Sequence, residues 1–510
     1  MYQYAASRPS SSHASVCRSQ PSGQAANSVQ DPDAAQLERR TNDRVAPRLA
    51  PAHRSGHGAT VRSIIATALA VPLLSGTLGG VVGCRHAQPE ALVEGELRER
   101  VGHGFATERG DDAPPALPAE VRLDDGVSAD EAVAIALWNS ATFRIELTRL
   151  HAAEAELAAA KRPSNPTLRL LFPAGPQQLS VLLTWPIENL VTMPRRIKVA
   201  RTNLDVVAAQ VVQIGVDLAR DVKLAHADWA LAHDRLAVRG SLAADFAAIA
   251  TIVRARANGG DVPVTEAEIA EADARLASDE VARARDEVAI AGSRLEARLG
   301  GVSLRAANPS AMAPATIAAH ASSAGEAWAA SARDTRPDLR AAQLALETAG
   351  ARVGLERAAV LNLAGVGYGV GPAFTGGVQG ELPIASQNQL GVGRARAQLE
   401  AARWRVVELR QRVDAEVTQA RTQLDGALRS WRLYDDEVVA ARTRDLAAAT
   451  AQYDLGESDY AAVLLSAQRL ETTRLRMIEL AADVRRAHAE LERAVGRRLG
   501  ASPPSTKESR

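Results

Sequence analysis

The apolar residues of positions 195–258 recur every three or four residues, and the stretch contains no proline. This spacing places them on one stripe of a helix and is typical of a coiled-coil seam. One four-residue stutter interrupts the stripe, which predicts local unwinding of the supercoil. At about 1.5 Å per residue, a helix over this stretch is about 95 Å long. The stripe consists of Leu204, Val207, Val211, Ile214, Leu218, Val222, Ala225, Trp229, Ala232 and Leu236.

A second proline-free stretch begins at residue 384, runs to 455 and repeats the plan of the first. Pro186 and Gly259 in the first copy are as far apart as Pro383 and Gly456 in the second. Its apolar residues also step by three and four, with one stutter. Self-similarity on this scale indicates an internal duplication, in which each copy is one structural unit.

Each of the two glycines is followed by a further helical stretch that returns along the first. The returning segments are 264–299 and 459–499, and both are dense in Ala, Arg, Glu and Leu. Each copy is therefore predicted to form a long antiparallel hairpin with glycine near its tip, because glycine readily adopts the left-handed geometry that ends a helix. We divide the chain into a first repeat 128–300, a linker 301–335 and a second repeat 336–500.

A pair of short strands is predicted before each long helix, within 167–187 and 362–384. Residues 363–370 alternate between apolar residues and glycines. Tilted strands of about 9–11 residues can cross a bilayer, but an open sheet edge is not tolerated in lipid. Four strands cannot close a barrel, so several copies must share one. Trp185 and Tyr368 are candidates for the aromatic girdles of that barrel, with buried packing as the alternative.

The N-terminal residues have the layout of an export signal. Residues 1–60 lack apolar periodicity and are predicted to be a disordered extension or to follow a mis-assigned start. Residues 61–83 have the pattern of a signal peptide, with Pro72 and several glycines arguing against a membrane-spanning helix. Residues 84–127 are assigned to a tether and belt segment, and 501–510 to a disordered tail. The signal ends in Val81, Val82, Gly83 and Cys84.

These last four residues resemble a bacterial lipobox. The resemblance implies that the signal is cleaved before Cys84 and that its sulfur carries a lipid. Two or three acyl chains on one residue would anchor the protein stably to a membrane. Residue 85 is Arg, whereas lipoproteins retained in the inner membrane commonly have Asp there, so the expected destination is the outer membrane.

Composition excludes several classes of function. Of the 510 residues 46% are hydrophobic but only 3% are aromatic, which suits close-packed long helices. The 60 basic residues balance the 60 acidic ones, so no nucleic-acid partner is expected. The two cysteines, Cys17 and Cys84, cannot form a disulfide framework or a thiolate metal cluster for the rest of the chain. We find no catalytic grouping and expect neither an enzyme nor a cofactor; His226 and His233 are interpreted as tunnel-wall residues rather than metal ligands.

Several short stretches, spread over 128–500, recur in this order in one known protein family. They are Ser128-Ala-Asp-Glu-Ala-Val-Ala-Ile-Ala-Leu137, Arg336-Pro-Asp-Leu339, Leu382-Pro-Ile384, Arg394-Ala-Arg-Ala-Gln-Leu399, Tyr453-Asp-Leu-Gly-Glu-Ser458, Val463-Leu-Leu-Ser-Ala-Gln468 and Leu499-Gly500. Together with the order of elements, they resemble the TolC-like outer-membrane efflux protein family. The stretch from Leu382 to Gln389 further resembles the heavy-metal branch of that family, whose members work with resistance-nodulation-division pumps.

This resemblance implies a mainly α-helical fold with a small β part. A homotrimer would form a periplasmic α-barrel tunnel and a shared 12-stranded β-barrel in the outer membrane of a Gram-negative bacterium. Its partners would be outer-membrane lipid, a periplasmic adaptor and an inner-membrane pump, while the duct itself is passive. The linker 301–335 and the helix predicted from Ser128 to Lys161 would form a belt around the tunnel.

The resemblance also places the adaptor contact and the gate at the hairpin tips. Some members carry two aspartates three residues apart early in the last helix, and the matching positions here are Val463 and Ser466. The acidic ring is therefore expected to be absent or to be formed by Glu457 and Asp459. The candidate tip residues are Gly259, Gly260, Asp261 and Val262 in the first hairpin, with Tyr453, Gly456, Glu457, Ser458 and Asp459 in the second.

One alternative function remains open. A lipid-anchored periplasmic coiled-coil scaffold without a pore would explain the helices and the lipobox, but it would not explain two alternating strand pairs. Within the efflux interpretation, the substrate is not specified by the sequence. Metal ions, drugs and secreted proteins all remain candidates.

Overall fold

The computed structural model describes residues 89–106, 114–123, 125–172, 179–305, 307–322, 327–360, 362–370, 373–381 and 383–499. All of them belong to one compact unit, Arg85–Arg510. The predicted lipobox at 81–84, the predicted extension and signal before it and the predicted tail 501–510 lie outside the described residues.

The long helix of the first repeat is α5, which spans the 72 residues Glu188–Gly259 and is followed by the returning helix α6, Val264–Arg298. Helix α5 begins seven residues before the predicted start at 195, because Pro194 lies inside the helix rather than ahead of it. A proline near a helix start removes one backbone hydrogen bond without ending the helix. Half of the predicted stripe is buried, including Leu204, Val211, Val222 and Trp229, and the rest is half-buried.

The long helix of the second repeat is interrupted. It consists of α10 (Gln389–Leu433), a π-helical turn η2 (Tyr434–Val438) and α11 (Val439–Asp454), and the returning helix is α12 (Tyr460–Val495). The prediction of one continuous helix over 384–455 is therefore wrong at η2. No proline or glycine stands in this turn, so the sequence carries no local sign of the interruption.

The helix predicted from Ser128 to Lys161 is in fact two helices, α3 (Ala129–Asn139) and α4 (Ala141–Ala160). Ser140 between them has an extended backbone, and its hydroxyl accepts a hydrogen bond from the Phe143 amide. A serine in this role is a strong N-cap and begins a new helix. The shorter elements are α2 (Pro89–Val101), α7 (Pro314–Ser322), α8 (Ala327–Thr335), α9 (Pro337–Ala358) and the parallel strand pair β1 (Val127–Ser128) and β4 (Pro309–Ser310).

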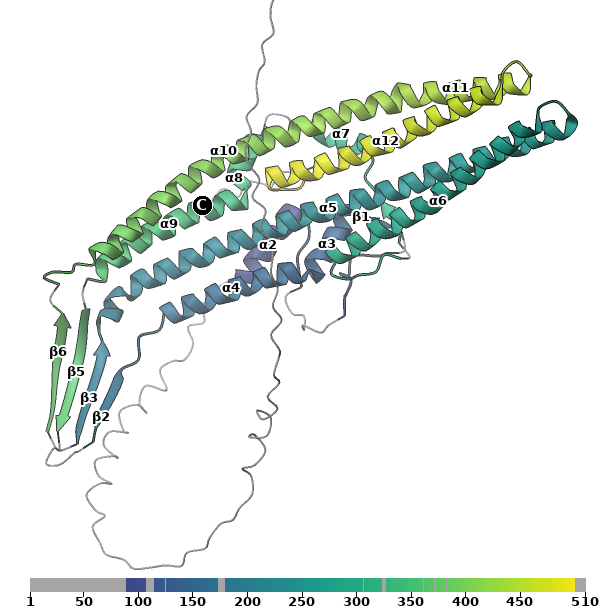
Figure 1. Cartoon of the computed structure of the whole chain (residues 1–510). Helices are drawn as coiled ribbons and strands as arrows, with labels where there is room; N and C mark the ends of the chain where they lie inside the picture. The colour runs from purple at the N-terminus through teal and green to yellow at the C-terminus, as the bar shows by residue number, and fades with distance from the viewer. Residues whose placement is uncertain are drawn as a thin grey trace, which may run out of the picture. The chain divides into compact units, whose positions relative to one another are not determined.

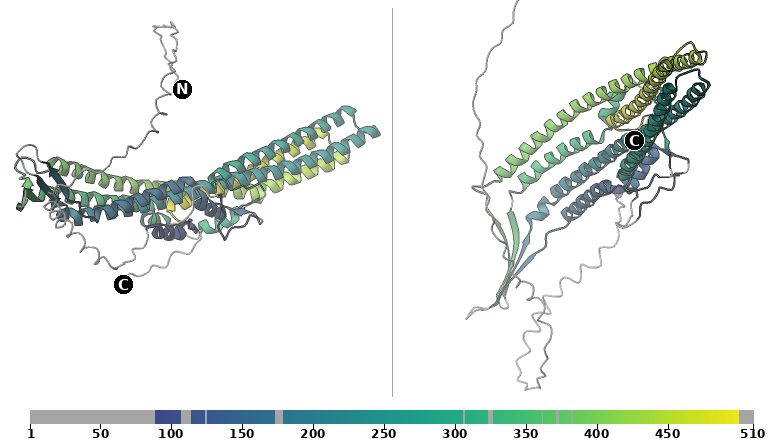
Figure 2. Two further views of the ribbon diagram at one scale, coloured as in Figure 1. Left: turned by 90° about the horizontal axis from the view of Figure 1, so that it is seen from below. Right: turned by 45° about the vertical axis from the view of Figure 1, so that its right-hand side comes forward.

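The long helices pack side by side in the same order at two levels (Figure 1). On the side of the sheet, α4 packs on α5, α5 on α9, and α9 on α10. On the side of the hairpin tips, α6 packs on α5, α5 on α12, and α12 on α11. The short elements α2, α3, α7, α8 and the β1–β4 pair lie around the middle of α5 and the C-terminal part of α12, and we call them the belt (Figure 2).

Two large apolar clusters lie at the level of the belt. One joins α2, α3 and α4 to the middle of α5, where Leu97 packs on Gly215. A β-carbon at Gly215 would come within 2.5 Å of Leu97, so only glycine admits α2 at this place. The other cluster joins α7 and α8 to α10 and α12. Among the described helices α5 also contains a window apolar enough, by composition alone, to cross a membrane.

The four-stranded sheet within the described residues is antiparallel and has the order β2-β3-β5-β6. Both predicted strand pairs are therefore present, and the two repeats meet between β3 and β5. The helix layer begins where the sheet ends, since β3 leads directly into α5. The strands are β2 (Thr167–Leu171), β3 (Ser180–Pro186), β5 (Asn362–Val370) and β6 (Ala373–Glu381).

Candidate functional site

The tip of the first hairpin is a tight left-handed turn. Gly260 has φ +82°, and the amides of Gly260 and Asp261 bond back to the carbonyls of Ala257 and Arg256. This pattern is a Schellman-type helix end, which needs a residue that tolerates a positive φ. Of the predicted tip residues here, Gly259, Gly260 and Asp261 are exposed and Val262 is half-buried.

The tip of the second hairpin has the same construction. Gly456 has φ +75°, and the carboxylate of Asp459 accepts a hydrogen bond from the Ala462 amide as the N-cap of α12. Glu457 is exposed and Ser458 is half-buried, whereas Tyr453 is buried. Gly456 and Asp459 therefore have local structural roles as well as a position at the tip.

Two tyrosines of the second hairpin bond to carboxylates of the first. The Tyr453 hydroxyl donates to Glu266 Oε1 at 3.0 Å, and the Tyr460 hydroxyl donates to Asp273 Oδ2 at 3.1 Å. Both tyrosines and both acids are one heptad apart, so the same contact occurs twice along the seam. We call these two contacts the tyrosine rungs. Arg256 reinforces the rung formed by Tyr453. Its guanidinium donates to the Tyr453 carbonyl and lies 4.6 Å from the centroid of the Tyr453 ring.

The environment keeps both phenols protonated. Burial and the neighbouring Asp273 raise the pKa of Tyr460, and burial and Glu266 raise the pKa of Tyr453. A phenol that stays protonated remains a hydrogen-bond donor to a carboxylate over the physiological pH range. The tips are thus held by charge-assisted hydrogen bonds, which are stronger than neutral ones.

The sequence predicted only one member of these rungs, Tyr453. Tyr460, Glu266, Asp273 and Arg256 were missed, because no local pattern pairs a residue of α12 with one of α6. The structure brings the two predicted tips together in one apolar cluster that contains Val262 and Tyr453. Val463, at one of the family's aspartate positions, is buried in the same cluster, and the Ser466 hydroxyl bonds to the Ala462 carbonyl.

The two faces of the sheet differ in chemistry. Cross-strand partners share a face, so the register assigns every side chain. One face, the apolar face, carries only apolar residues and glycines: Leu168, Leu170, Val181, Leu183, Trp185, Leu363, Gly365, Gly367, Gly369, Phe374, Gly376, Val378 and Gly380. The other, the mixed face, includes Thr167, Arg169, Ser180, Thr184, Tyr368, Thr375, Gln379 and Glu381.

Trp185 and Tyr368 lie on opposite faces of this sheet. Trp185 pairs with Gly365, three residues from Tyr368, and side chains alternate along a strand. The two side chains therefore project from opposite faces of the sheet, and in the predicted barrel only one of them would face lipid, so the girdle assignment of each stays a prediction. Trp185 shares the apolar face with Phe374, whose ring lies over Gly367 and Gly369.

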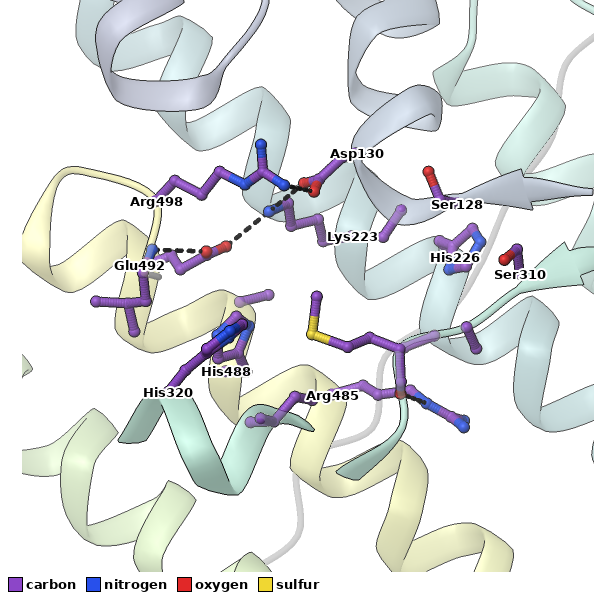
Figure 3. Close-up of a pocket in the computed structure, with 17 residues that line it drawn as sticks. Ser128, Asp130, Lys223, His226, Ser310, His320, Arg485, His488, Glu492 and Arg498 are labelled. Atoms are coloured by element: carbon purple, nitrogen blue, oxygen red, sulfur yellow. Dashed lines mark hydrogen bonds and ion pairs between the residues drawn. The ribbon is translucent and has the colours of Figure 1, made fainter. Parts of the chain in front are cut away.

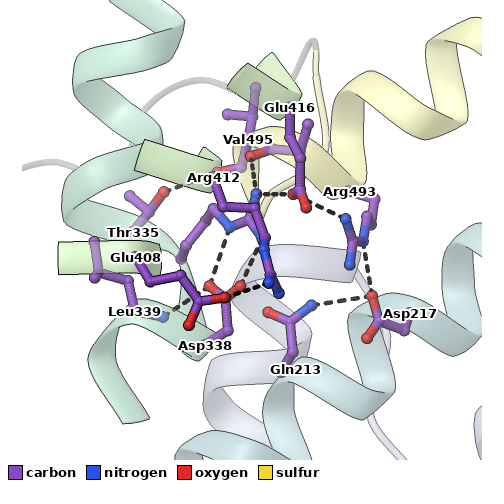
Figure 4. Close-up of polar contacts among 12 residues, drawn as sticks. Gln213, Asp217, Thr335, Asp338, Leu339, Glu408, Arg412, Glu416, Arg493 and Val495 are labelled. Atoms are coloured by element: carbon purple, nitrogen blue, oxygen red, sulfur yellow. Dashed lines mark hydrogen bonds and ion pairs between the residues drawn. The ribbon is translucent and has the colours of Figure 1, made fainter. Parts of the chain in front are cut away.

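A network of ion pairs ties the two repeats together next to the belt (Figure 4). The guanidinium of Arg336, only 1% exposed, donates to Asp338 and Glu416, and Arg493 donates to the same Glu416 and to Asp217. These residues come from α5, α9, α10 and α12 and the residue before α9. Burial alone would raise the pKa of Asp338, but the hydrogen bonds and charge of Arg336 outweigh it and lower that pKa.

A cavity of about 510 Å³ lies among α3, α5, α7 and α12 (Figure 3). On its wall Lys223 bonds to Asp130 at 2.9 Å and to Glu492 at 2.7 Å, and Arg498 also pairs with Asp130. Burial would lower the pKa of Lys223, but the two carboxylates raise it. The lysine is therefore charged, and it links the belt helix α3 to α5 and α12.

Three histidines line the same cavity. His226 bonds to the Val127 carbonyl at 2.7 Å, and the rings of His320 and His488 are 6.5 Å apart. Burial lowers the pKa of both His226 and His488. In the part of the chain that the structure describes, no three His, Cys, Asp or Glu side chains form a group that could hold a metal ion. The predicted pair His226 and His233 flanks Trp229, with both rings edge-on to the indole.

No protein-family model matches the chain, and no curated protein matches it. Solved structures of membrane channels do match. CusC, which forms a transmembrane channel, is 17% identical with a TM-score of 0.59, and the match covers 76% of this chain and 99% of the CusC chain. The outer membrane protein VceC of Vibrio cholerae is 14% identical with a TM-score of 0.58, and the match covers 72% of this chain and 96% of the VceC chain. The CmeC outer membrane channel of Campylobacter jejuni is 13% identical with a TM-score of 0.58, and the match covers 77% of this chain and 94% of the CmeC chain.

Proposed function

We propose that this chain, which has the fold of the TolC-family outer-membrane channels, is the passive exit duct of a tripartite efflux system. One observation carries the proposal: the sheet and both helix layers are open at the same two edges. Within the described residues, β2, α4 and α6 form one edge, and β6, α10 and α11 form the other. A unit that is open in this way at every level is completed by copies of itself arranged in a ring.

The ring would be closed by head-to-tail contacts between identical chains. Each contact joins two different surfaces, which is the heterologous type of interface that generates cyclic oligomers. Three copies supply twelve strands, and a closed barrel removes the unpaired strand edges that lipid does not tolerate. The homotrimer is the assembly that the fold implies.

The apolar residues at the edges support this ring. Large apolar side chains are exposed along one edge of each helix level, and mainly alanines along the other. On α6 the residues Ile269, Leu276 and Ile290 are about half exposed or more and recur at heptad spacing, whereas α11 exposes alanines. On α10 Trp404 and Val407 are exposed, whereas α4 exposes alanines and a single large apolar residue, Ile145. The exposed alanines are Ala440, Ala447 and Ala451 on α11, and Ala152, Ala155 and Ala159 on α4.

The sheet is proposed to be this chain's share of an outer-membrane barrel. Its apolar face, with Trp185 and Phe374, would contact lipid, and its mixed face would line the aqueous duct. Trp185 keeps the predicted girdle position, and its Nε1 donates to the Ser164 carbonyl below the sheet. Tyr368 would face the duct.

A lipid anchor on Cys84 fits this placement. Four residues lie between Cys84 and Pro89, the first residue of α2, and the five residue-to-residue steps span at most about 17 Å. Glu90 contacts His151 on α4, and the helix from His151 to Ala160 rises about 14 Å towards the sheet. The tether is therefore long enough for acyl chains on Cys84 to reach the membrane boundary near the end of α4.

The hairpin tips are proposed to form the gate and the adaptor-binding site. The tyrosine rungs would stabilise the closed arrangement, and an adaptor that binds the open arrangement better would shift the population towards it. The exposed residues Gly259, Gly260, Asp261, Glu457 and Asp459 are the proposed contact surface. The partner pump, of the resistance-nodulation-division type, would supply the energy, and the substrate class remains open between metal ions, drugs and proteins.

The first test is the mass of detergent-extracted protein from separated outer membranes, measured by light scattering with the detergent subtracted. We expect a trimer that also produces ion conductance in planar bilayers once the tyrosine rungs are removed. A monomer without conductance, or a protein confined to the inner membrane or periplasm, would contradict the duct and support the lipid-anchored scaffold.

A further inference from the structure

Gly240 lies in the interior of α5 without a packing reason to be glycine. A β-carbon there would meet nothing within 4 Å among the described residues. Gly215 and Gly292 in the same hairpin differ, because Leu97 and Trp229 pack against them. A glycine in a helix interior weakens the helix relative to alanine. At Gly240 this weakness is not offset by any close contact.

The second repeat has its own weak point, the π-helical turn η2. Five residues, Tyr434–Val438, form it, and its three acidic side chains are exposed. A single π-turn inside an α-helix widens the backbone ladder, and it is one of the few identifiable places where long helices bend.

The internal duplication places these two features at equivalent positions. The offset that takes Pro186 to Pro383 and Gly259 to Gly456 takes Gly240 to Glu437, within η2. The long helix is therefore weakened at the same point in both repeats, by a glycine in the first and by a π-helical turn in the second.

The two features also lie at one level in space. Val238 of α5 and Leu475 of α12 pack against the same small apolar cluster. On the side of α12 away from α5, η2 contacts α12. This contact lies between two apolar clusters, one containing Leu428 and Val484 and the other containing Leu446 and Ala467. The same stretch of α12, around residue 475, thus passes between Gly240 and η2.

The contacts towards the tips and the belt are more buried than the ion pairs at the level itself. Towards the tips, the tyrosine rungs and their apolar cluster join both hairpins. Towards the belt, Lys223 and Arg493 anchor α5 to α12. At the level itself, Arg235 pairs with Glu479 of α12 at 2.9 Å beside a small apolar cluster, and each of these two side chains is about a third exposed. A partly exposed ion pair adapts to a change of angle more readily than a packed core does.

We propose that Gly240 and η2 form a hinge shared by the two hairpins. The tip segments beyond it bend while the belt stays fixed. The inference rests on the proposed duct: bending at this level moves the tips towards or away from the axis without melting any helix. A partner that binds the tips drives the bend, and the hinge determines the free energy that bending requires.

The test stiffens the hinge from both sides. Gly240→Ala restores helix propensity, and deletion of Asp436 converts the π-turn to α-helix. Gly354→Ala in α9 is the matched control, because a β-carbon there also meets nothing within 4 Å of described residues. Open fraction is measured in planar bilayers with both tyrosine rungs removed by Tyr453→Phe and Tyr460→Phe. We expect each hinge change to lower the ratio of open to closed channels by up to about two- to fivefold, because the full glycine–alanine difference in helix propensity is reached only if the residue leaves the helix, and we expect Gly354→Ala to leave the ratio unchanged.

A second measurement separates the hinge from the duct. Spin labels at Asp261→Cys on the tip and Asp125→Cys near the belt, both exposed positions, report the distance within one labelled chain diluted among unlabelled ones. We expect a broad distribution that narrows with Gly240→Ala or the Asp436 deletion. Equal open fractions and equal widths for hinge and control variants would overturn the hinge. Absent conductance in every variant, with the widths still narrowing, would contradict the duct but not the bending.

Discussion

The hydroxyl of Tyr460 on α12 donates a hydrogen bond of 3.1 Å to Asp273 on α6 and so joins the two hairpins of one chain. The residue one heptad earlier, Tyr453, makes the equivalent contact with Glu266. Neither contact is needed to form a hairpin, because each hairpin has its own apolar seam. Their role is therefore to fix one hairpin against the other at the tips.

Removing the tyrosine rungs should loosen the tips while the fold persists. A hydrogen bond to a charged group contributes about 1.5–3 kcal/mol, so Tyr453→Phe with Tyr460→Phe should increase the open fraction at least tenfold and leave secondary structure unchanged. Single-channel recording in planar bilayers measures the open fraction, and circular dichroism measures the helix content. Tyr368→Phe, on the mixed face of the sheet, is the matched control. An open fraction equal to that of the control would show that the rungs do not restrain the gate.

Lys223 is predicted to be essential to the junction between the belt and the long helices. It is almost fully buried between Asp130 and Glu492, and removing one member of a buried ion pair leaves an uncompensated charge. Lys223→Met should therefore destabilise the protein by about 3–5 kcal/mol. The exposed Lys198 on the same helix provides the control, Lys198→Met. Guanidinium denaturation followed by circular dichroism measures the difference.

The same ion pairs allow a compensating experiment. The double change Lys223→Met and Glu492→Gln removes the cation and one of its anions and leaves Asp130 paired with Arg498, so it should recover much of the stability lost in Lys223→Met. A double variant less stable than the single one would mean that the Glu492 carboxylate contributes by contacts other than its charge.

The sequence predicted elements whose cause is local and missed contacts whose cause is not. Heptad spacing and the tip glycines identified α5, α6 and α12, and alternation identified both strand pairs. The π-turn η2 was missed because no proline or glycine marks it, and Ser140 was missed because a serine within an apolar helical pattern usually points to solvent. Register across β3 and β5 pairs residues far apart in the chain, so only the structure could separate Trp185 from Tyr368.

Acidification should destabilise the belt through its buried histidines. Burial lowers the pKa of His226 and of His488 in the folded protein below the ordinary value of 6.5. Below pH 6.5 the unfolded chain therefore binds more protons than the folded one, and stability falls as the pH falls. Above about pH 7 both states are neutral at these positions and the effect vanishes.

Melting temperature measured from pH 5 to pH 8 tests this dependence. His226→Gln and His488→Gln should each flatten the decline below pH 6.5, although each also removes native contacts and lowers the melting temperature at pH 8. The comparison is therefore the slope against pH, not the absolute value. The exposed and uncharged Gln210 on α5 provides the control, and Gln210→Ala should leave the slope unchanged. Equal slopes in all variants would assign the pH dependence to other groups.

Introducing an arginine at two positions of β6, three residues apart, should affect membrane assembly in one case and not in the other. Val378 lies on the apolar face and Thr375 on the mixed face, and both are exposed in the isolated chain. If the sheet is part of a membrane barrel, Val378→Arg places a cation against lipid, at a cost of about 2–4 kcal/mol per chain near the bilayer midplane. Thr375→Arg places the same cation in the aqueous duct, where it remains hydrated. We expect Val378→Arg to reduce the amount of heat-modifiable oligomer in the outer membrane several-fold and Thr375→Arg to leave it near the wild-type level. Equal loss in both variants would mean that the two faces do not separate lipid from water, and the sheet would then not be a barrel wall.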